Sequence, residues 1–367
     1  MRYLITGGGT GGHIYPALAI AKEIKDKYKD AEILYVGTKE GLEAELVPRE
    51  GFKFKTIRVK GMPRKLNKQS LIAIKALLDG LNDSKKILKD FKPDIVIGTG
   101  GYVCGPMVYM ASKLNIKTLI HEQNAFPGIT NKILSRYVDK VAITFEEAIK
   151  YFKYPDRVIN TGNPIRSQIL NIDKKMAYKE LKLESNKPLI LSFGGSGGQK
   201  KLNDVMLNFI EKNLKSNIQI IHITGTRLYD DFISEIKEKN IIIPNNIQIV
   251  PYFYKMPEAL NIAKLVITSA GAITLAEISA VGVASVLIPK SYTAENHQEY
   301  NAKSFEANGA SKVILEKELT NELFLNTINE LLENEEKLHE MGKYSKNLGK
   351  LDAAKNIINI IDGLTLN

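Results

Sequence analysis

The residues best suited to chemistry lie near the start of the chain, where residues 7–13 read Gly-Gly-Gly-Thr-Gly-Gly-His. An imidazole titrates near neutrality, so His13 is a candidate general base. Glycines let a ligand approach the backbone, and a helix that follows such a turn presents free N–H groups. The turn is therefore suited to hold a phosphate or to leave room for a substrate. The alternative is that His13 is an ordinary surface or packed histidine.

Three of these glycines also fit the G-x-G-x-x-G pattern of dinucleotide sites, namely Gly7, Gly9 and Gly12. A nicotinamide site needs an acidic residue at the end of the second strand to hold the ribose, and residues 35–38 contain none. A strand–helix turn without any ligand needs fewer than five glycines. The sequence therefore disfavours both a nicotinamide cofactor and a purely structural turn.

Two further polar stretches follow predicted strands of the first half, at residues 98–102 and residues 121–124. The carboxyl ends of parallel strands meet at one edge of a sheet, so we expect both stretches to lie beside His13. Polar residues gathered at one edge indicate a substrate site. Solvated loops are the alternative.

The second half of the chain carries groups suited to a sugar nucleotide. Arg166 is a bidentate cation that could meet a diphosphate. Residues 271–277 predict a glycine turn that enters a helix, whose N–H groups could hold a diphosphate while Glu277 accepts from ribose hydroxyls. Residues 297–301 offer amides for sugar hydroxyls. A surface arginine and a glutamate on a helix face are the alternatives.

Apolar runs alternate with amphipathic segments along the chain, which predicts an α/β fold with parallel sheets. Turn formers at residues 161–164 interrupt the pattern, which then restarts, so we expect two similar domains that form a ligand-binding cleft. Candidate strands lie at residues 2–6, 33–36, 95–98, 118–121, 140–143, 189–193, 219–224, 247–250, 265–267 and 285–288. Candidate helices include residues 15–28, 70–88 and 352–364.

Composition limits the classes of function. A single cysteine, Cys104, excludes an internal disulfide and favours a reducing cytoplasm. We expect no signal peptide and no membrane-spanning stretch. The five histidines lack metal-ligand spacing and no Asp-x-Asp pair occurs, so we expect no metal and no other cofactor.

The net charge of +10 lies in the first half, because residues 1–163 hold 27 Lys and Arg against 17 Asp and Glu, whereas residues 164–367 hold 24 of each. Such asymmetry indicates an anionic partner, either nucleic acid or a membrane surface, with a solvated lysine-rich surface as the alternative. No nucleic-acid-binding motif is recognised, so we expect no nucleic acid.

Residues 61–92 combine basic and apolar side chains as a membrane-associated surface does. An amphipathic helix packed on the sheet is the alternative. The expected membrane face comprises Arg64, Lys65, Lys68, Leu71 and Ile72.

Taken together, the motifs resemble one family of bacterial enzymes over essentially the whole chain. The ordered set is specific, although no single motif is. The motifs lie at residues 6–13, 98–105, 121–124, 162–166, 194–196, 252–257, 270–277 and 297–301. The family is that of the UDP-N-acetylglucosamine:N-acetylmuramyl-(pentapeptide) pyrophosphoryl-undecaprenol N-acetylglucosamine transferases, the MurG family.

This resemblance implies the GT-B fold, in which two Rossmann-like domains with parallel sheets face each other across a deep cleft. We expect an acceptor and membrane-associating domain at residues 1–163 and a UDP-N-acetylglucosamine-binding domain at residues 164–345. A C-terminal helix at residues 346–367 is expected to pack back on the first domain.

The implied reaction is an inverting transfer of N-acetylglucosamine from UDP-N-acetylglucosamine. The acceptor is the C4 hydroxyl of the muramoyl sugar of undecaprenyl-pyrophosphoryl-N-acetylmuramoyl-pentapeptide (lipid I), and the product is lipid II for peptidoglycan synthesis. The implied partners are UDP-N-acetylglucosamine, lipid I, an anionic membrane surface and other cell-wall synthesis proteins. The resemblance thus implies a peripheral protein at the cytoplasmic face of the cell membrane.

The resemblance also assigns roles to individual residues. His13 is the candidate base and Glu122 is the alternate. The acceptor side comprises Gly7, Gly8, Gly9 and Tyr102. The diphosphate meets residues 272–275, Glu277 holds the ribose, and the backbone of Phe253 lies against the uracil. The full donor set is Thr10, Gly11, Gly12, Asn124, Arg166, Ser196, Phe253, Ala272, Ile273, Thr274, Leu275, Ala276, Glu277 and Gln298.

Three positions depart from the family pattern. Gly197 stands where the family usually carries glutamine or leucine, and His297 stands where some members carry glutamine. Ser269 replaces a common arginine before the Ala-Gly-Ala turn, which leaves more of the charge to Arg166. These departures concern donor affinity, because none of them touches His13 or Glu277.

Two other functions fit parts of the sequence. Another GT-B enzyme, such as a glycolipid synthase or a UDP-sugar epimerase, would act on UDP-N-acetylglucosamine without lipid I, and the motifs of the first half argue against it. A basic nucleic-acid-binding protein would bind DNA or RNA with steep salt dependence.

Overall fold

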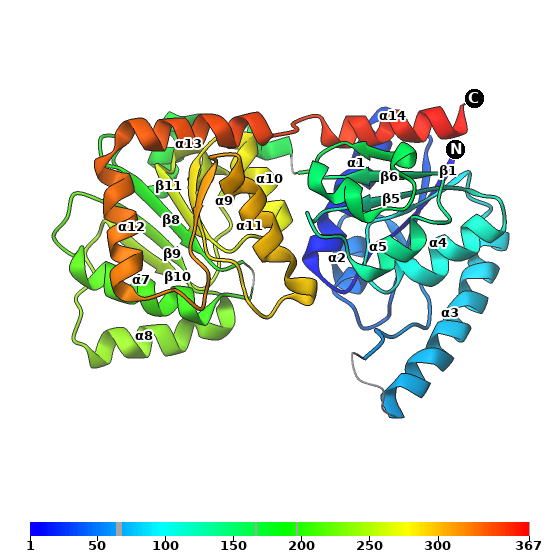
Figure 1. The fold of residues 1–367 in the computed structure, drawn as a ribbon, viewed down its shortest axis with the longest axis horizontal. Helices are drawn as coiled ribbons and strands as arrows, with labels where there is room; N and C mark the ends of the chain where they lie inside the picture. Colours follow the sequence, from blue (N-terminus) through cyan, green and yellow to red (C-terminus); the bar gives the residue numbers. More distant parts are fainter. Residues whose placement is uncertain (64–67, 166, 196, 367) are drawn as a thin grey trace. The chain divides into compact units, whose positions relative to one another are not determined.

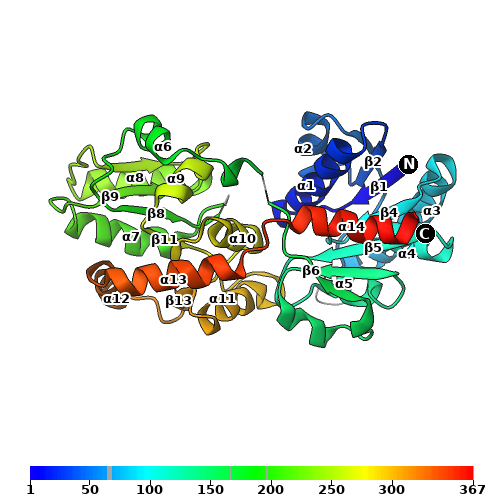
Figure 2. The ribbon, with the colours of Figure 1, turned by 90° about the horizontal axis from the view of Figure 1, so that it is seen from above.

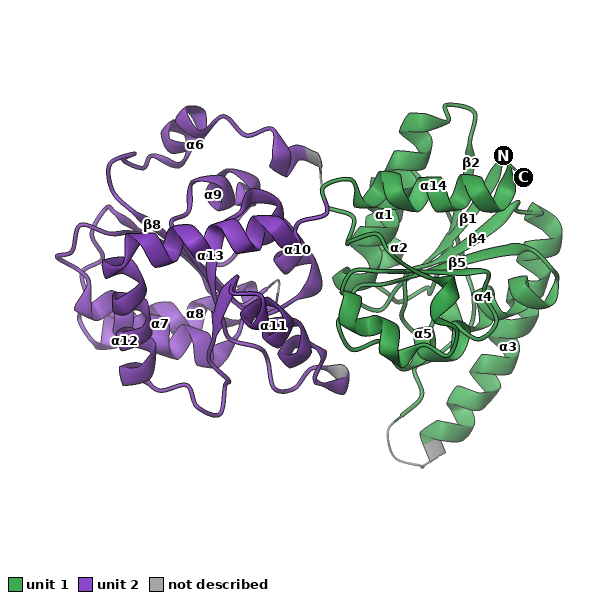
Figure 3. Ribbon diagram, turned by 45° about the horizontal axis from the view of Figure 1, so that its top comes forward, with its two compact units in different colours: residues 1–165, 351–367 green, residues 166–350 purple. Residues whose placement is uncertain are grey.

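The computed structural model describes residues 1–63, 68–165, 167–195 and 197–366. The chain divides into two compact units, which Figure 3 shows in different colours. Unit 1 comprises Met1–Ile165 and Leu351–Asn367, and unit 2 comprises Arg166–Lys350. The expected boundary after residue 163 lies two residues before the observed one.

The start of the C-terminal segment differs from the expectation. Residues 346–350 belong to unit 2, because helix α13 (Glu335–Leu348) extends to residue 348 and packs on α10 (Ala272–Val281). The next helix, α14 (Ala353–Thr365), belongs to unit 1.

Unit 1 is built on a seven-stranded sheet in which every neighbouring pair is parallel (Figure 1). The strand order is β3-β2-β1-β4-β5-β6-β7. Most of these strands are short apolar runs, as a sheet covered on both faces requires. The strands are β1 (Arg2–Thr6), β2 (Glu32–Gly37), β3 (Lys53–Thr56), β4 (Ile95–Gly98), β5 (Lys117–Glu122), β6 (Lys140–Ile143) and β7 (Val158–Asn160).

Helices cover both faces of this sheet. Alternate strand residues point to opposite faces, so Tyr3 and Ile5 pack with α1 and α14, whereas Leu4 packs with α3 and α4. Figure 2 shows α14 lying over this unit, where it contacts α1 and β5. The helices are α1 (Gly11–Lys27), α2 (Glu43–Arg49), α3 (Lys68–Phe91), α4 (Cys104–Lys113), α5 (Ile129–Leu134), and the 3-10 turns η1 (Glu146–Tyr151) and η2 (Pro155–Arg157).

Unit 2 repeats this plan with a six-stranded parallel sheet in the order β10-β9-β8-β11-β12-β13. Its strands are β8 (Leu189–Phe193), β9 (Gln219–Ile223), β10 (Ile247–Val250), β11 (Leu265–Thr268), β12 (Ala284–Leu287) and β13 (Ser311–Val313). Its remaining helices are η3 (Ser167–Leu170), α6 (Lys174–Leu181), α7 (Lys200–Lys212), η4 (Thr226–Leu228), α8 (Tyr229–Glu238), α9 (Met256–Ile262), η5 (Ala294–Asn296), α11 (His297–Ala307) and α12 (Asn321–Glu333).

The predicted α/β class with a parallel sheet in each half is confirmed. The short edge strands β3, β7 and β13 were absent from the expectation, because they are partly exposed and lack a long apolar run. Helix α1 begins at Gly11 instead of residue 15, so the last two glycines of the turn form its first residues.

Replacing Ile357 by alanine tests whether α14 is part of the core of unit 1. The side chain is fully buried between α14, α1 and the sheet, and its truncation leaves a cavity. We expect the free energy of unfolding, measured by chemical denaturation, to fall by about 2–5 kcal/mol. Asn359→Ala, at an exposed position of the same helix, is the matched control. Equal effects of the two changes would contradict this packing.

Candidate active site

Three loops of unit 1 meet at the carboxyl edge of its sheet. In the register of the central strands, Thr6 of β1 lies beside Gly98 of β4, and Gly98 lies beside Ile120 of β5. The first glycine turn, the turn after β4 and Gln123 after β5 therefore start from one edge. This confirms the prediction that the polar stretches lie beside His13.

The first two turns are in backbone contact. The N–H of Gly8 donates to the carbonyl of Gly100 at 3.4 Å, and Gly101, at φ +82°, would place a Cβ 2.2 Å from the Gly8 oxygen. A Cβ on Gly7 would lie 2.0 Å from the hydroxyl oxygen of Thr99. A side chain at Gly7 or Gly101 would therefore clash with the neighbouring turn. The assignment of Gly7 to the acceptor side stays a prediction.

A buried carboxylate that the sequence analysis missed holds the first turn. Glu43 accepts hydrogen bonds from the N–H of Gly9 at 3.2 Å, from the N–H of Thr38 at 3.0 Å and from the Thr38 hydroxyl at 2.7 Å. A Cβ on Gly8 would lie 2.5 Å from a Glu43 oxygen. Glu43 lies on α2, whereas a nicotinamide site would have its acidic residue at the end of the second strand. Its carboxylate accepts from backbone N–H groups of the protein.

His13 is the third residue of α1 and is partly exposed. Its Nδ1 lies 3.0 Å from Oε1 of Gln123, and its carbonyl accepts from the Thr99 hydroxyl at 2.8 Å. A Cβ on Gly100 would lie 2.8 Å from Nδ1, so the imidazole fills the space beside this glycine. The ring is therefore held at the sheet edge, as a general base must be.

Glu122, the alternate base, is buried and accepts hydrogen bonds at both oxygens. Oε1 accepts from the backbone N–H of Asn124 at 2.9 Å and from its side chain at 3.2 Å. Oε2 accepts from the N–H of Gly128 at 3.1 Å and from the side chain of Asn131 at 2.8 Å. A carboxylate committed to four donors organises its loop, so the geometry favours His13 over Glu122 as the base.

Tyr102 lies at the end of the turn after β4. Its side chain is 37% exposed, and the ring would contact a Cβ on Gly9 at 3.4 Å. This contact places a partly exposed aromatic ring against the first glycine turn.

In unit 2, the β11–α10 turn and α11 are joined at the corresponding sheet edge. The α10 helix starts at Ala272 after Gly271, and the side chain of Asn301 donates to the carbonyl of Ala270 at 3.1 Å. Glu277 is buried in the second turn of α10, and Gln298 accepts from the N–H of Lys290 at 3.0 Å. The first-turn N–H groups of α10 form the kind of helix terminus that binds phosphate.

Two cations that the sequence analysis missed approach the glycine turn after β8, called here the second glycine turn, which includes Gly194, Gly195, Gly197 and Gly198. Lys290 Nζ donates to the carbonyl of Gly198 at 2.8 Å and lies 3.9 Å from the position of a Cβ on Gly195. A guanidinium nitrogen of Arg227 lies 3.5 Å from the position of a Cβ on Gly197. Burial lowers the pKa of Lys290, and the neighbouring Arg227 adds to this effect. A cluster of two cations at a glycine turn suits a diphosphate.

Some of the predicted residues lie outside the described part of the chain. Arg64, Lys65, Arg166 and Ser196 lie outside the described residues, as does the side chain of Lys68. Phe253 is described and partly exposed, and its sequence neighbours Tyr252 and Tyr254 are exposed with their rings in contact. Ser269, which stands where an arginine was expected, is buried.

The N-terminal half of helix α3 carries its large apolar residues on the outside, whereas Ile87 and Leu88 near its C-terminal end are buried in the core of unit 1. Other buried positions of the helix include the small residues Ser70, Ala73, Gly80 and Ser84. Leu71 is 71% exposed, and further exposed apolar side chains are Ile72, Ile74, Leu77 and Leu78. This pattern is the reverse of an ordinary packed amphipathic helix and leaves an apolar surface with exposed lysines nearby at positions 75, 85, 86 and 89.

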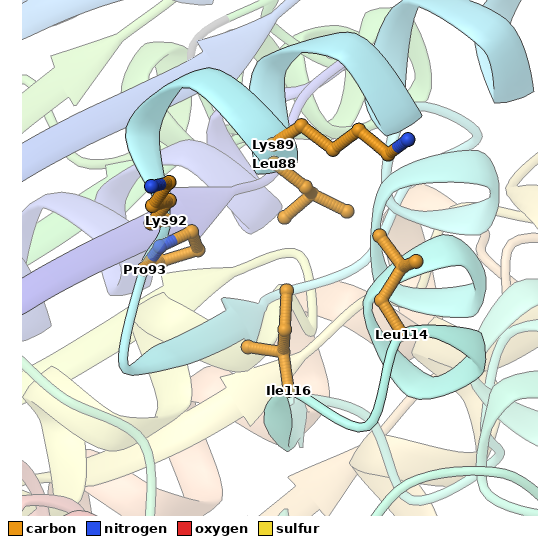
Figure 4. A pocket seen from close by; sticks show the side chains of 6 residues that line it. All are labelled: Leu88, Lys89, Lys92, Pro93, Leu114 and Ile116. Atoms are coloured by element: carbon orange, nitrogen blue, oxygen red, sulfur yellow. The ribbon is translucent and has the colours of Figure 1, made fainter.

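A shallow hollow of about 330 Å³ lies at the C-terminal end of α3. Figure 4 shows Leu88, Leu114 and Ile116 pointing into it, beside Lys89 and Lys92. The hollow contains no candidate catalytic residue, and it extends the combination of apolar and basic groups along α3.

Within the described residues, no group of three or more His, Cys, Asp or Glu side chains could hold a metal ion. In the same part of the chain, no helix is long and apolar enough to cross a membrane.

Glu43→Gln tests the anchoring of the first glycine turn. A carboxamide keeps one oxygen, but its nitrogen cannot accept a hydrogen bond, so the contacts with either Gly9 or Thr38 are lost. We therefore expect the free energy of unfolding to fall by about 1–3 kcal/mol. Chemical denaturation measures the change. Glu45→Gln, two residues along the same helix and exposed, is the control. A loss no larger than that of the control would show that Glu43 does not hold the turn.

Comparison with known families and relatives covers nearly the whole chain. Residues 3–143 match the N-terminal domain of glycosyltransferase family 28, and residues 189–357 match its C-terminal domain. The UDP-N-acetylglucosamine–N-acetylmuramyl-(pentapeptide) pyrophosphoryl-undecaprenol N-acetylglucosamine transferase of Thermoanaerobacter sp. (strain X514) is 52% identical over 365 residues, which cover 100% of both chains. The transferase of the same name from Finegoldia magna is 50% identical over 361 residues, which cover 98% of this chain and 96% of the relative.

Solved structures agree with this assignment. The crystal structure of MurG from Acinetobacter baumannii matches with a TM-score of 0.79 and 28% identity, over 99% of both chains. The UDP-N-acetylglucosamine 2-epimerase from Neisseria meningitidis, bound to UDP-N-acetylglucosamine, matches with a TM-score of 0.71 and 15% identity, over 98% of this chain and 99% of the epimerase. The second likeness concerns the fold alone. The chain belongs to glycosyltransferase family 28, in the group of the UDP-N-acetylglucosamine–N-acetylmuramyl-(pentapeptide) pyrophosphoryl-undecaprenol N-acetylglucosamine transferases.

Proposed function

We propose that this protein transfers N-acetylglucosamine from UDP-N-acetylglucosamine to the C4 hydroxyl of the muramoyl sugar of lipid I, which yields lipid II. The observation that carries the proposal is the 52% identity over the full length of a relative named for this transfer. The arrangement at the edge of unit 1 supports it, because a histidine is held there by a buried hydrogen-bond network.

The proposed chemistry is a single displacement. His13 takes the proton of the acceptor hydroxyl as the oxygen attacks the anomeric carbon of the donor, on the face opposite UDP. The bond from the acceptor oxygen to the sugar forms while the bond from the sugar to the diphosphate breaks, and UDP leaves with the electron pair. An α-linked donor therefore gives a β-linked product. Glu122 is the alternate base, and its four hydrogen bonds speak against it.

The donor is proposed to bind mainly to unit 2. The N–H groups at the start of α10, residues 272–275, would hold the diphosphate, and Glu277 would accept from the ribose hydroxyls. The backbone of Phe253 would lie against the uracil, with Ser196 and Arg166 nearby. Lys290 and Arg227 add positive charge beside the second glycine turn, where the departing diphosphate needs it.

The remaining predicted residues belong to the two sugars. Gln298 of unit 2 and Asn124 of unit 1 would bind the N-acetylglucosamine, with residues 10–12 shaping the place where donor and acceptor meet. Residues 7–9 and Tyr102 would lie on the acceptor side. This assignment follows the family resemblance and agrees with the place of these residues at the carboxyl edges of their sheets.

The protein is further proposed to act as a peripheral protein at the cytoplasmic face of the cell membrane, where lipid I presents its headgroup. The outward apolar residues of α3 and the lysines around them combine the two signals that stable membrane association requires. Other cell-wall synthesis proteins are expected partners at the same surface.

A transfer assay tests the proposed function. Labelled UDP-N-acetylglucosamine is incubated with a lipid I analogue, and a labelled disaccharide-lipid is expected. A UDP-sugar epimerase, whose fold is similar, would instead convert the donor without any acceptor. The absence of the disaccharide, with an active transferase as control, would falsify the assignment.

Two substitutions separate catalysis from donor binding. His13→Ala is expected to lower kcat by roughly 100-fold or more, with the donor KM little changed, because it removes the base. Glu277→Ala is expected to raise the donor KM by roughly 10-fold or more, because a charged hydrogen-bond acceptor is lost. Steady-state kinetics measure both, with the exposed Glu238→Ala as control. An unchanged kcat in the first variant, or an unchanged KM in the second, would remove that residue from its role.

A further pair of substitutions tests membrane association. Leu71→Glu combined with Leu78→Glu places two charges on the outward face of α3, and we expect binding to vesicles containing phosphatidylglycerol to weaken by at least roughly 10-fold. Ile242→Glu, at an 87% exposed position of unit 2, is the matched control. Vesicle sedimentation measures the binding, and an unchanged result for α3 would place the docking surface elsewhere.

A further inference from the structure

We propose that Gln123 is a positioning residue that holds His13 in the tautomer with the proton on Nδ1, which leaves Nε2 as the basic nitrogen. The inference rests on the proposed function only in that His13 is the base of the transfer. It is carried by hydrogen-bond geometry within unit 1.

The orientation of the Gln123 side chain is fixed by its surroundings. Its Nε2 lies 2.7 Å from the carbonyl oxygen of Thr99 and 3.1 Å from that of His121, and both oxygens can only accept. Turning the amide over would bring Oε1 against these two carbonyls. The amide is buried, so water cannot relieve such a clash of acceptors.

The orientation of Gln123 in turn sets the proton on His13. With Nε2 committed to the carbonyls, Oε1 faces Nδ1 of His13 at 3.0 Å. An amide oxygen has no proton to donate, so Nδ1 must carry one. In the neutral imidazole, Nε2 then holds the lone pair, and it makes no hydrogen bond with any residue that the structure describes.

The hydrogen bonds of a second histidine, His121, support the same orientation of the Gln123 amide. Nε2 of His121 lies 3.0 Å from the carbonyl oxygen of Gly162, so this nitrogen carries the proton. Nδ1 of His121 then carries no proton and lies 3.0 Å from Nε2 of Gln123, whose two hydrogens are shared among this nitrogen and the two carbonyl oxygens. Burial lowers the pKa of His121 to about 4, so the ring is neutral at physiological pH. Gln123 therefore joins two histidines that hold opposite tautomers.

The tautomer matters because a base must present a lone pair to the hydroxyl. With the proton on Nε2, His13 would offer an N–H to the acceptor and could not remove its proton. The backbone around the ring is fixed as well, since Thr99 binds the carbonyl of His13 and Gly100 closes the other side. Gln123 thus acts through His13, and it does so without touching the substrate.

Nitrogen-15 NMR of the full-length protein with labelled histidine tests the proposal directly. The His13 signals, assigned by comparison with His13→Asn, should show a protonated Nδ1 and an unprotonated Nε2. The His121 signals should show the opposite pattern. A protonated Nε2 and a bare Nδ1 on neutral His13 would overturn the proposal. The NMR measurement does not depend on transferase activity, so a wrong tautomer can be distinguished from a wrong proposed function.

Variants extend the test to the reaction. Gln123→Met is expected to populate the other tautomer of His13 and to lower kcat by about 10-fold to 100-fold, with the donor KM within about 2-fold, as expected when part of a general base's contribution is lost. Gln123→Glu is not a conservative replacement here, because it would place a carboxylate oxygen against the carbonyls of Thr99 and His121.

Gln219→Met is the matched control for removing a buried glutamine. Gln219 is buried in unit 2 and donates to the carbonyls of Glu184 and Lys187, so its loss affects stability without reaching His13. A folded Gln123→Met protein with the wild-type tautomer and wild-type kcat would overturn the proposal. If Gln123→Met does not fold, the wild-type spectrum decides it, because a bare Nδ1 on neutral His13 would contradict the proposal.

Discussion

The candidate site of unit 1 depends on a backbone contact between the turn after β1 and the turn after β4. Gly101 can approach the carbonyl of Gly8 only because neither turn carries a side chain there. The contact brings Thr99 against Gly7 and against the carbonyl of His13, and it brings Gly100 against the imidazole. The position of the proposed base is therefore a consequence of how two glycine turns pack at one sheet edge.

Unit 2 also contains a glycine turn that packs closely against a neighbouring loop, namely the turn after β8. A Cβ on Gly198 would lie 2.2 Å from the carbonyl oxygen of Thr224, so the second glycine turn also packs against a neighbouring loop. Here the space near the turn holds the cations Lys290 and Arg227 in place of a histidine. Lys290 offers a cation near Ser269, where the family resemblance led us to expect an arginine, since both lie within 4 Å of the position of a Cβ on Gly195. The proposed base thus lies at a glycine turn of unit 1, and two cations lie at a glycine turn of unit 2.

Much of this could be predicted from the sequence, because buried parallel strands are continuous apolar runs and glycine turns mark their carboxyl ends. The bounds of β1 and β4 were predicted to the residue, and the common edge of the loops followed from the parallel sheet. The roles of Glu43 and Gln123 could not be predicted, because each acts through contacts with residues distant in sequence. The outward face of α3 was also undecided, since an apolar stripe does not reveal which side of a helix packs.

In the proposed reaction, the acceptor oxygen is deprotonated by His13 and displaces UDP in a single step. The anomeric configuration of the product tests this most directly, by proton NMR of the new glycosidic bond formed from α-linked UDP-N-acetylglucosamine. The account predicts a β linkage. An α linkage would require two displacements or attack from the side of the leaving group, and it would contradict the role given to His13.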